Sequence, residues 1–169
     1  AASPSTGGYS HPISDLYVYS SRPWEYLIPS PNHPLLGKYA LGLDLHGSNL
    51  IEQTVFLGYI PVLLVIVSIF FWIKEKKRTP GLDYRTDFAI RLFSLIALIA
   101  FLSSLPPTIN FGYLDIQMPS SFIYKFVKSF RSYARFSIVV TLSVALLSGV
   151  AIKLLLNGRK PWFKAVSTL

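Results

Sequence analysis

The sequence predicts an all-α membrane protein with three transmembrane helices, one amphipathic helix on the outer face of the membrane, and an irregular extracytoplasmic N-terminal segment. Of the 169 residues, 51% are hydrophobic and only 14% are charged, whereas a soluble domain carries about 25% charged residues. Three apolar runs interrupt the chain, and about 20 mostly apolar residues are enough for a helix to cross a bilayer. These runs also argue against a nucleic-acid-binding domain, so we expect the net charge of +8 to face membrane lipids.

The three runs and their flanking residues divide the chain into eight segments. Asn49 and Glu52 have the spacing of a helix capping box before the first run, and Pro61 is expected to bend that helix. Pro106 and Pro107 are expected to end the second helix. The predicted segments are an extracytoplasmic irregular segment at 1–53, a span at 54–74, a cytoplasmic basic loop at 75–86, a span at 87–105, an outer loop at 106–119, the amphipathic helix at 120–135, a span at 136–156 and a cytoplasmic basic tail at 157–169.

Basic residues in the loops predict the orientation of these spans. The connection KEKKRTPGLDYR, residues 74–85, holds five Lys or Arg residues, and the tail NGRKPWFK holds three more. With three spans, these two segments lie on one side, and their basic bias makes that side cytoplasmic. We therefore expect a multi-pass protein of the cell membrane with its N-terminal segment outside. Arg91 in the second run is expected to pair with Asp87, four residues earlier.

The stretch KFVKSFRSYARF, residues 125–136, places cations on the predicted outer side. Nothing from Ser120 to Phe136 breaks a helix, and on a helical wheel the apolar residues Phe122, Ile123, Phe126, Val127, Phe130 and Ala134 share one arc. The opposite arc holds Lys125, Lys128, Arg131 and Arg135. Such a helix lies in the membrane plane. The cations then either form a site for a lipid-linked phosphate, gripped by the two arginines, or contact ordinary phospholipid headgroups.

The N-terminal segment holds a second set of candidate residues. Arg22, Glu25, His33 and Glu52 are titratable or charged residues on one predicted outer segment, so they are candidates to supply a general base and to line an outer cavity. The alternative for each of them is a solvated or capping loop residue. Prolines on both sides of His33 are expected to hold it in a stiff turn. The spacing of the charged and titratable residues matches no metal-binding signature, and the chain has no Cys. We therefore expect no metal site and identify no cofactor.

Three stretches of the chain resemble a known family. They are YSSRPWEYLIPSPNHPLLG at 19–37, EQTVFLGYIPVLL at 52–64, and 105–152, which contains F-R-x-x-x-R-F directly before an apolar run. They resemble the YfhO-like proteins and related membrane glycosyltransferases of the GT-C type. The resemblance implies transfer of a sugar from a polyprenyl-phosphate-linked donor on the outer face of the membrane. It also implies that Arg131 and Arg135 stabilise the donor phosphate as it leaves, and that His33 and Glu52 line the same cavity.

One feature departs from the family pattern. In GT-C enzymes the acidic residue that activates the acceptor follows an N-terminal transmembrane helix, and no such helix precedes Ala1 in this sequence. The expectation is therefore a middle or C-terminal portion of a longer polytopic chain, inactive alone, that needs the rest of the chain or partner subunits. The alternative is a non-catalytic membrane scaffold or a component of lipid or polymer transport. Both alternatives have membrane lipids as partners, and only the first needs a lipid-linked sugar donor.

Overall fold

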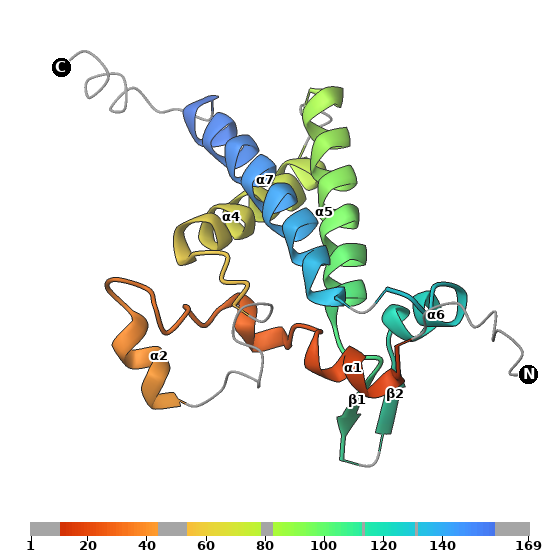
Figure 1. The fold of residues 1–169 in the computed structure, drawn as a ribbon. Helices are drawn as coiled ribbons and strands as arrows, with labels where there is room; N and C mark the ends of the chain where they lie inside the picture. Colours follow the sequence, from red (N-terminus) through yellow and green to blue (C-terminus); the bar gives the residue numbers. More distant parts are fainter. Residues whose placement is uncertain (1–10, 44–53, 79–82, 113, 131, 158–169) are drawn as a thin grey trace, which may run out of the picture. The chain divides into compact units, whose positions relative to one another are not determined.

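The structure of the chain, a computed structural model, describes residues 11–43, 54–78, 83–112, 114–130 and 132–157. Within these ranges the protein is mostly helical, with one small antiparallel sheet. The chain divides into two compact units, which are described separately (Figure 1). Unit 1 comprises residues 1–56 and 98–139, and unit 2 comprises residues 57–97 and 140–169. The predicted fold class is therefore confirmed in its helical character, whereas the sheet was not predicted.

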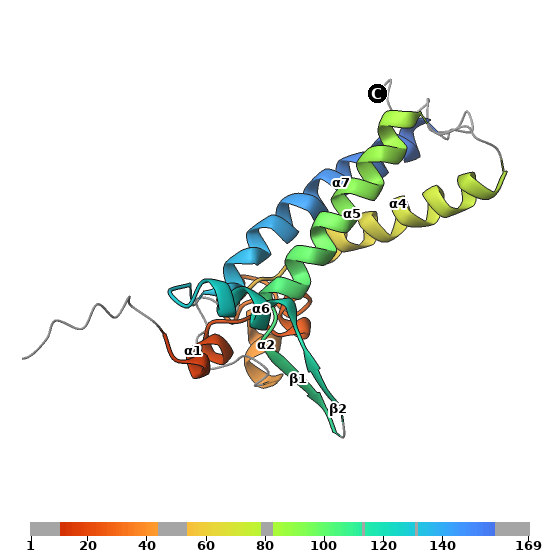
Figure 2. The same ribbon diagram turned by 90° about the vertical axis from the view of Figure 1, so that its right-hand side faces the viewer.

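Unit 2 consists of α4 (Tyr59–Arg78) and parts of two longer helices, α5 (Tyr84–Ser104) and α7 (Ser137–Asn157). Within this unit α5 and α7 run antiparallel, and α4 crosses them obliquely (Figures 1 and 2). Polar side chains tie all three helices together. The indole N–H of Trp72 donates to Asp87 Oδ1 at 2.6 Å, and the ammonium of Lys153 donates to Thr86 Oγ1 at 2.9 Å.

Two helices of the described chain are long and apolar enough to cross a membrane. They are α5, Tyr84–Ser104, and the segment Tyr133–Leu156, which contains nearly all of α7. Large apolar side chains such as Leu95 and Leu142 stay exposed on both of them. This exposure is unfavourable in water and favourable in hydrocarbon, which indicates membrane association for these helices.

The start of α4 differs from the predicted start at residue 54. Residues 54–58 are not helical, and Gly58 has a φ of +82°, a left-handed conformation that glycine adopts without strain. The helix begins at the next residue, so Pro61 lies in its first turn. A proline in the first turn removes no helical hydrogen bond, so the bend predicted at this residue has no physical cause. Asn49 and Glu52, the predicted capping box, lie outside the described residues.

The other two helices agree closely with the sequence prediction. Helix α5 begins one turn earlier than residue 87, because the backbone C=O of Asp83 already accepts from Thr86 N–H at 2.9 Å. It ends at Ser104, two residues before Pro106, the first of the two prolines expected to end it. Arg91 pairs with Asp87 at 2.9 Å, as predicted from their spacing. In α7 the hydroxyl of Ser148 donates to the Pro61 carbonyl of α4 at 3.2 Å.

Unit 1 is built from short elements. Its N-terminal part contains α1 (Ile13–Val18), the 3-10 helix η1 (Pro23–Tyr26) and α2 (Gly37–Leu43). Residues 106–119, predicted to be a loop, instead contain a hairpin of β1 (Thr108–Phe111) and β2 (Leu114–Gln117), with Phe111 opposite Leu114. Gly112, with φ of +70°, begins the two-residue turn. Helix α6 (Pro119–Phe126) and η2 (Tyr133–Phe136) follow.

The core of unit 1 joins the N-terminal part to residues that follow α5. Leu16, Tyr26, Tyr133 and Ala134 are all at most 3% exposed. The N-terminal segment that was predicted to be mostly irregular contains short helices at 13–18, 23–26 and 37–43 among its described residues. Apolar side chains of these short helices are buried against the rest of unit 1. This burial stabilises helices that are too short to be stable alone.

Candidate lipid-phosphate site

The helix predicted at 120–135 is interrupted in the structure. Helix α6 ends at Phe126, and Val127 has φ of −129° and ψ of 77°, outside the helical region. A turn follows, and the chain becomes helical again only at Tyr133. The prediction of one continuous amphipathic helix is therefore wrong for this conformation.

Long-range hydrogen bonds give the reason for the interruption. In a continuous helix, Ala134 N–H would donate to the carbonyl four residues earlier. It donates instead to the Tyr19 carbonyl at 2.9 Å, and the Lys128 carbonyl accepts from His11 N–H at 3.1 Å. The N-terminal part of unit 1 thus takes backbone groups that a helix would use internally, and helical propensity alone cannot predict this competition.

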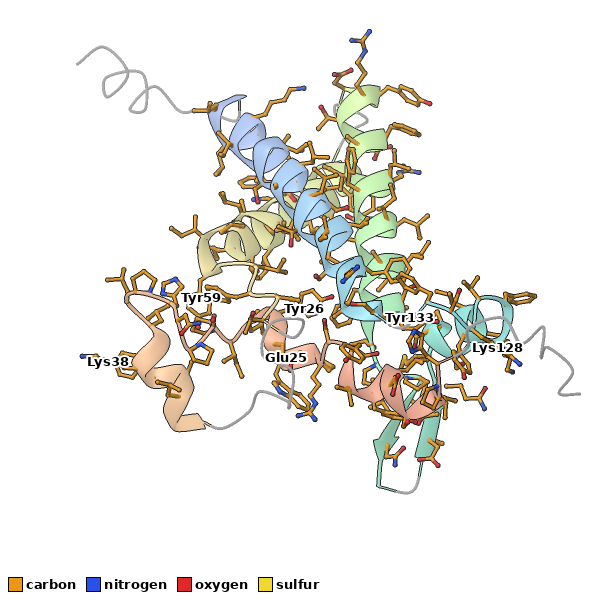
Figure 3. All side chains as sticks on the ribbon, viewed as in Figure 1. Glu25, Tyr26, Lys38, Tyr59, Lys128 and Tyr133 are labelled. Atoms are coloured by element: carbon orange, nitrogen blue, oxygen red, sulfur yellow. The ribbon has the colours of Figure 1, made fainter. Side chains whose placement is uncertain are left out.

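The interruption also separates the predicted cations. The ammonium of Lys125 lies 5.1 Å from the centre of the Phe122 ring, on α6. Lys128 is exposed in the turn on the outside of unit 1 (Figure 3), and Arg135 is exposed on η2. Arg131 lies outside the described residues. The three described cations are thus accessible to an anion, although they do not share one helical face.

The predicted apolar face divides in the same way. Ala134 is 1% exposed, whereas Phe122 is 53% and Phe126 86% exposed. Phe130 contacts Tyr133 edge to face, with ring centroids 5.1 Å apart, and Tyr133 is fully buried. One end of the predicted face therefore packs into the core of unit 1, and the other end remains accessible to a membrane surface.

Glu25, a predicted cavity residue, is fully buried and has a capping role. Its Oε2 accepts from the backbone N–H of Arg22 at 2.8 Å, which satisfies one of the free donors at the start of η1. Pro23 in the first helical position provides the fixed φ that a helix start favours. The guanidinium of Arg22 lies 5.8 Å from the centre of the Trp24 ring. This pair therefore orders the chain locally, and Glu52, its predicted neighbour, lies outside the described residues.

His33 also has a local role in the structure. Its Nδ1 accepts from Leu35 N–H at 3.3 Å and from Leu36 N–H at 3.2 Å. This arrangement favours the tautomer with the proton on Nε2. The stiff turn predicted around His33 is present, since His33 N–H donates to the Ser30 carbonyl at 2.9 Å.

A buried polar cluster at the end of α5 was not predicted from the sequence. The Tyr26 hydroxyl lies 2.6 Å from Ser104 Oγ, and Ser21 N–H donates to the Ser104 carbonyl at 2.9 Å. Burial raises the pKa of Tyr26 to about 12, and the nearby Glu25 adds to the rise, whereas side-chain hydrogen bonding with serines opposes it. The sequence contains a signal for the short helix that carries Tyr26, although not for its contact with Ser104. This signal is the R-P-W-E pattern, because proline followed by glutamate two residues later is typical of a helix start.

Comparison of the chain with known proteins assigns no function to these residues. No group of three or more His, Cys, Asp or Glu residues able to hold a metal occurs among the described residues. No protein-family model matches the chain, and no curated protein and no solved structure matches it either. The function is therefore argued from the residues themselves.

Proposed function

We propose that the chain is a membrane-embedded portion of a polytopic glycosyltransferase that binds the phosphate of a polyprenyl-linked sugar donor. One observation carries this proposal. Lys125 and Lys128 are exposed on the segment that leads into the candidate membrane span Tyr133–Leu156, and Arg135 is exposed in the first turn of that span. Cations next to the end of a span lie at the depth of lipid phosphates, where each contributes about 1 kcal/mol to anion binding.

The chemistry of these side chains fits a phosphate leaving group. An arginine presents a planar fork of donors that matches phosphate oxygens, and a lysine adds a compact positive charge. When the bond between sugar and phosphate breaks, negative charge accumulates on the phosphate, and fixed cations stabilise that charge. The sugar transfer is proposed from the family resemblance, and the contact with the phosphate is supported by the exposed cations.

The proposal includes three spans, with α4 as the third. Trp72 at one end of α4 bonds to Asp87 of α5, and Pro61 at its other end accepts from Ser148 of α7. These contacts support an apolar helix that is held against two membrane helices. The basic residues 74–85 and the basic tail then lie in the cytoplasm, and the segment 120–135 lies outside.

A second candidate function is favoured by the exposure of Phe122 and Phe126. Two aromatic rings one turn apart, next to Lys125, are typical of a helix that anchors a protein in the headgroup region. On this alternative the chain is a non-catalytic membrane scaffold or transport component, and its cations contact any anionic lipid equally well. The two functions differ in whether a polyprenyl phosphate is preferred.

The test measures binding of polyprenyl phosphate to the chain in neutral-lipid nanodiscs, with polyprenol, which lacks the phosphate, as the matched ligand. We expect clear preference for the phosphate, and a loss of roughly hundredfold when Lys125, Lys128 and Arg135 are all changed to Ala, at about 1 kcal/mol for each charge. Lys38→Ala, which removes an exposed lysine of α2, is the control variant. Equal competition by an ordinary anionic phospholipid would support the headgroup anchor instead.

A further inference from the structure

Residues 11–26, here named the strap, hold the last turn of α5 through three contacts. Ser21 N–H donates to the Ser104 carbonyl, and the Tyr26 hydroxyl lies 2.6 Å from Ser104 Oγ. The Tyr26 ring contacts Phe101 edge to face at 5.0 Å between centroids. Ser20 and Ser21 are fully buried at this contact. This end of the strap is therefore attached to the helix that precedes the hairpin.

The other end of the strap holds the cationic segment, residues 124–135. His11 N–H donates to the Lys128 carbonyl, and the Tyr124 hydroxyl donates to the His11 carbonyl at 2.6 Å. Ala134 N–H donates to the Tyr19 carbonyl. Each contact joins residues more than a hundred positions apart in the sequence, so none of them is available to the isolated segment.

Helix α1 connects these two ends of the strap. Its Leu16 is fully buried, and its Tyr17 hydroxyl lies 2.5 Å from Thr108 Oγ1 on the hairpin. His11 Nδ1 lies 3.3 Å from Asp15 Oδ2, one turn further along. A short helix fixed by these contacts is a stiff link, so the hold on α5 and the hold on the cationic segment form one docked unit.

The sequence and the structure of the cationic segment point to two different conformations. The apolar period from 120 to 135 is that of one continuous helix with all its cations on one arc, whereas the docked strap imposes a break after Phe126. In the docked conformation Phe122, Phe126 and Val127 remain exposed. In a continuous helix lying on a bilayer, these side chains would enter the apolar layer.

We propose that the strap is a latch: while docked it keeps the cationic segment in the broken conformation, and its release allows a continuous helix that gathers Lys125, Lys128 and Arg135 on one face. This inference rests on the proposed lipid-phosphate function for its ligand, although the conformational change itself does not need that ligand. Apparent affinity falls with the population of the competent state. The latch therefore weakens phosphate binding when docked and strengthens it when released.

Two single-atom variants loosen the latch without removing a cation. Tyr124→Phe deletes the hydroxyl that bonds to the His11 carbonyl, and Tyr26→Phe deletes the one that contacts Ser104. Ser104 keeps its hydrogen bond to the Phe101 carbonyl at 2.7 Å, so the second change leaves it a partner. Tyr39→Phe, at an exposed tyrosine of α2, is the matched control.

The first measurement uses no ligand. Hydrogen exchange of the full chain in nanodiscs is expected to become faster at the His11 amide and slower across residues 127–132 in the double variant Tyr26→Phe with Tyr124→Phe, because the strap leaves and helix forms. Unchanged exchange at both places, with Tyr39→Phe behaving like the native chain, overturns the latch. This hydrogen-exchange measurement tests the latch whether or not a polyprenyl phosphate binds.

The second measurement shifts the helix directly at Ser129, an exposed residue of the turn after α6. Ala favours a helix over Gly by an amount equivalent to about a fivefold change in helix population. We therefore expect Ser129→Ala to bind polyprenyl phosphate several-fold more tightly than Ser129→Gly, and the double Tyr variant to bind more tightly than the native chain. Equal affinities in the Ser129 pair, with phosphate still preferred to polyprenol, would overturn the latch and leave the proposed function standing. Loss of that preference would instead overturn the function.

Discussion

Units 1 and 2 differ in the range of the interactions that shape them. In unit 2 the helices themselves follow from apolar runs and from residues a few positions apart, such as Asp87 and Arg91, and distant contacts such as Lys153 with Thr86 join helices that are already formed. In unit 1 the decisive contacts join distant residues, such as His11 with Tyr124. A change in unit 2 is therefore expected to have a local effect, whereas a change in unit 1 is expected to affect segments far away in the sequence.

The largest expected effect is at Gly37, in the turn of unit 1 that begins α2. A Cβ at this position would lie 2.1 Å from the Pro31 carbonyl oxygen, so the backbone must move. We expect Gly37→Ala to lower the free energy of unfolding by about 3 kcal/mol, as overpacking against backbone does. The measurement is denaturant unfolding in detergent.

Gly149 in α7 is the control from unit 2. A Cβ there meets nothing within 4 Å, and Ala favours a helix over Gly by about 1 kcal/mol. Gly149→Ala is therefore expected to stabilise slightly. If both variants change stability by the same amount and in the same direction, the contrast between the two units is wrong at these positions.

An intermediate effect is expected at Tyr26 in alkaline solution. The folded pKa is about 12, against 10.0 for the free phenol. The unfolded chain therefore loses this proton first, so stability is fully present below pH 10 and decreases as the pH rises from about 10 to 12. The difference of two pKa units corresponds to about 2 to 3 kcal/mol. Tyr26→Phe removes this part of the decrease, and stability curves of native and variant chains that stay parallel above pH 10 would contradict the assignment.

The smallest expected loss of stability is at Asp87 in unit 2. Its carboxylate accepts from Trp72 and pairs with Arg91, whose side chain is largely exposed. An exposed ion pair contributes only about 0.5 kcal/mol, whereas the hydrogen bond to a charged group contributes about 2 kcal/mol. We therefore expect Asp87→Ala to lower stability more than Asp87→Asn, because Asn keeps an acceptor oxygen for the Trp72 indole. Melting temperatures of the two variants test this order. Equal losses of melting temperature in the two variants would show that the negative charge of Asp87, and not its acceptor oxygen, provides the stabilisation.

The candidate site was predictable only in part. The exposed cations Lys125, Lys128 and Arg135 follow from composition, because charged side chains stay at the surface. The roles of Glu25 and His33 were not predictable, since a carboxylate or an imidazole looks the same in the sequence whether it caps a helix or lines a cavity. The structure adds their local hydrogen bonds, in which Glu25 accepts from Arg22 N–H and His33 accepts from Leu36 N–H.

The sequence by itself determined the long helices α5 and α7 and the end of α5 before Pro106, because helical hydrogen bonds are local and proline interrupts them wherever it occurs. The same local pattern also predicted a helix from 120 to 135, and there it was wrong. The tertiary structure decided that segment, since the strap supplies partners for the Lys128 and Ala134 backbone. Local periodicity describes what a segment prefers alone, and a distant segment that bonds to its backbone changes which conformation has the lowest free energy.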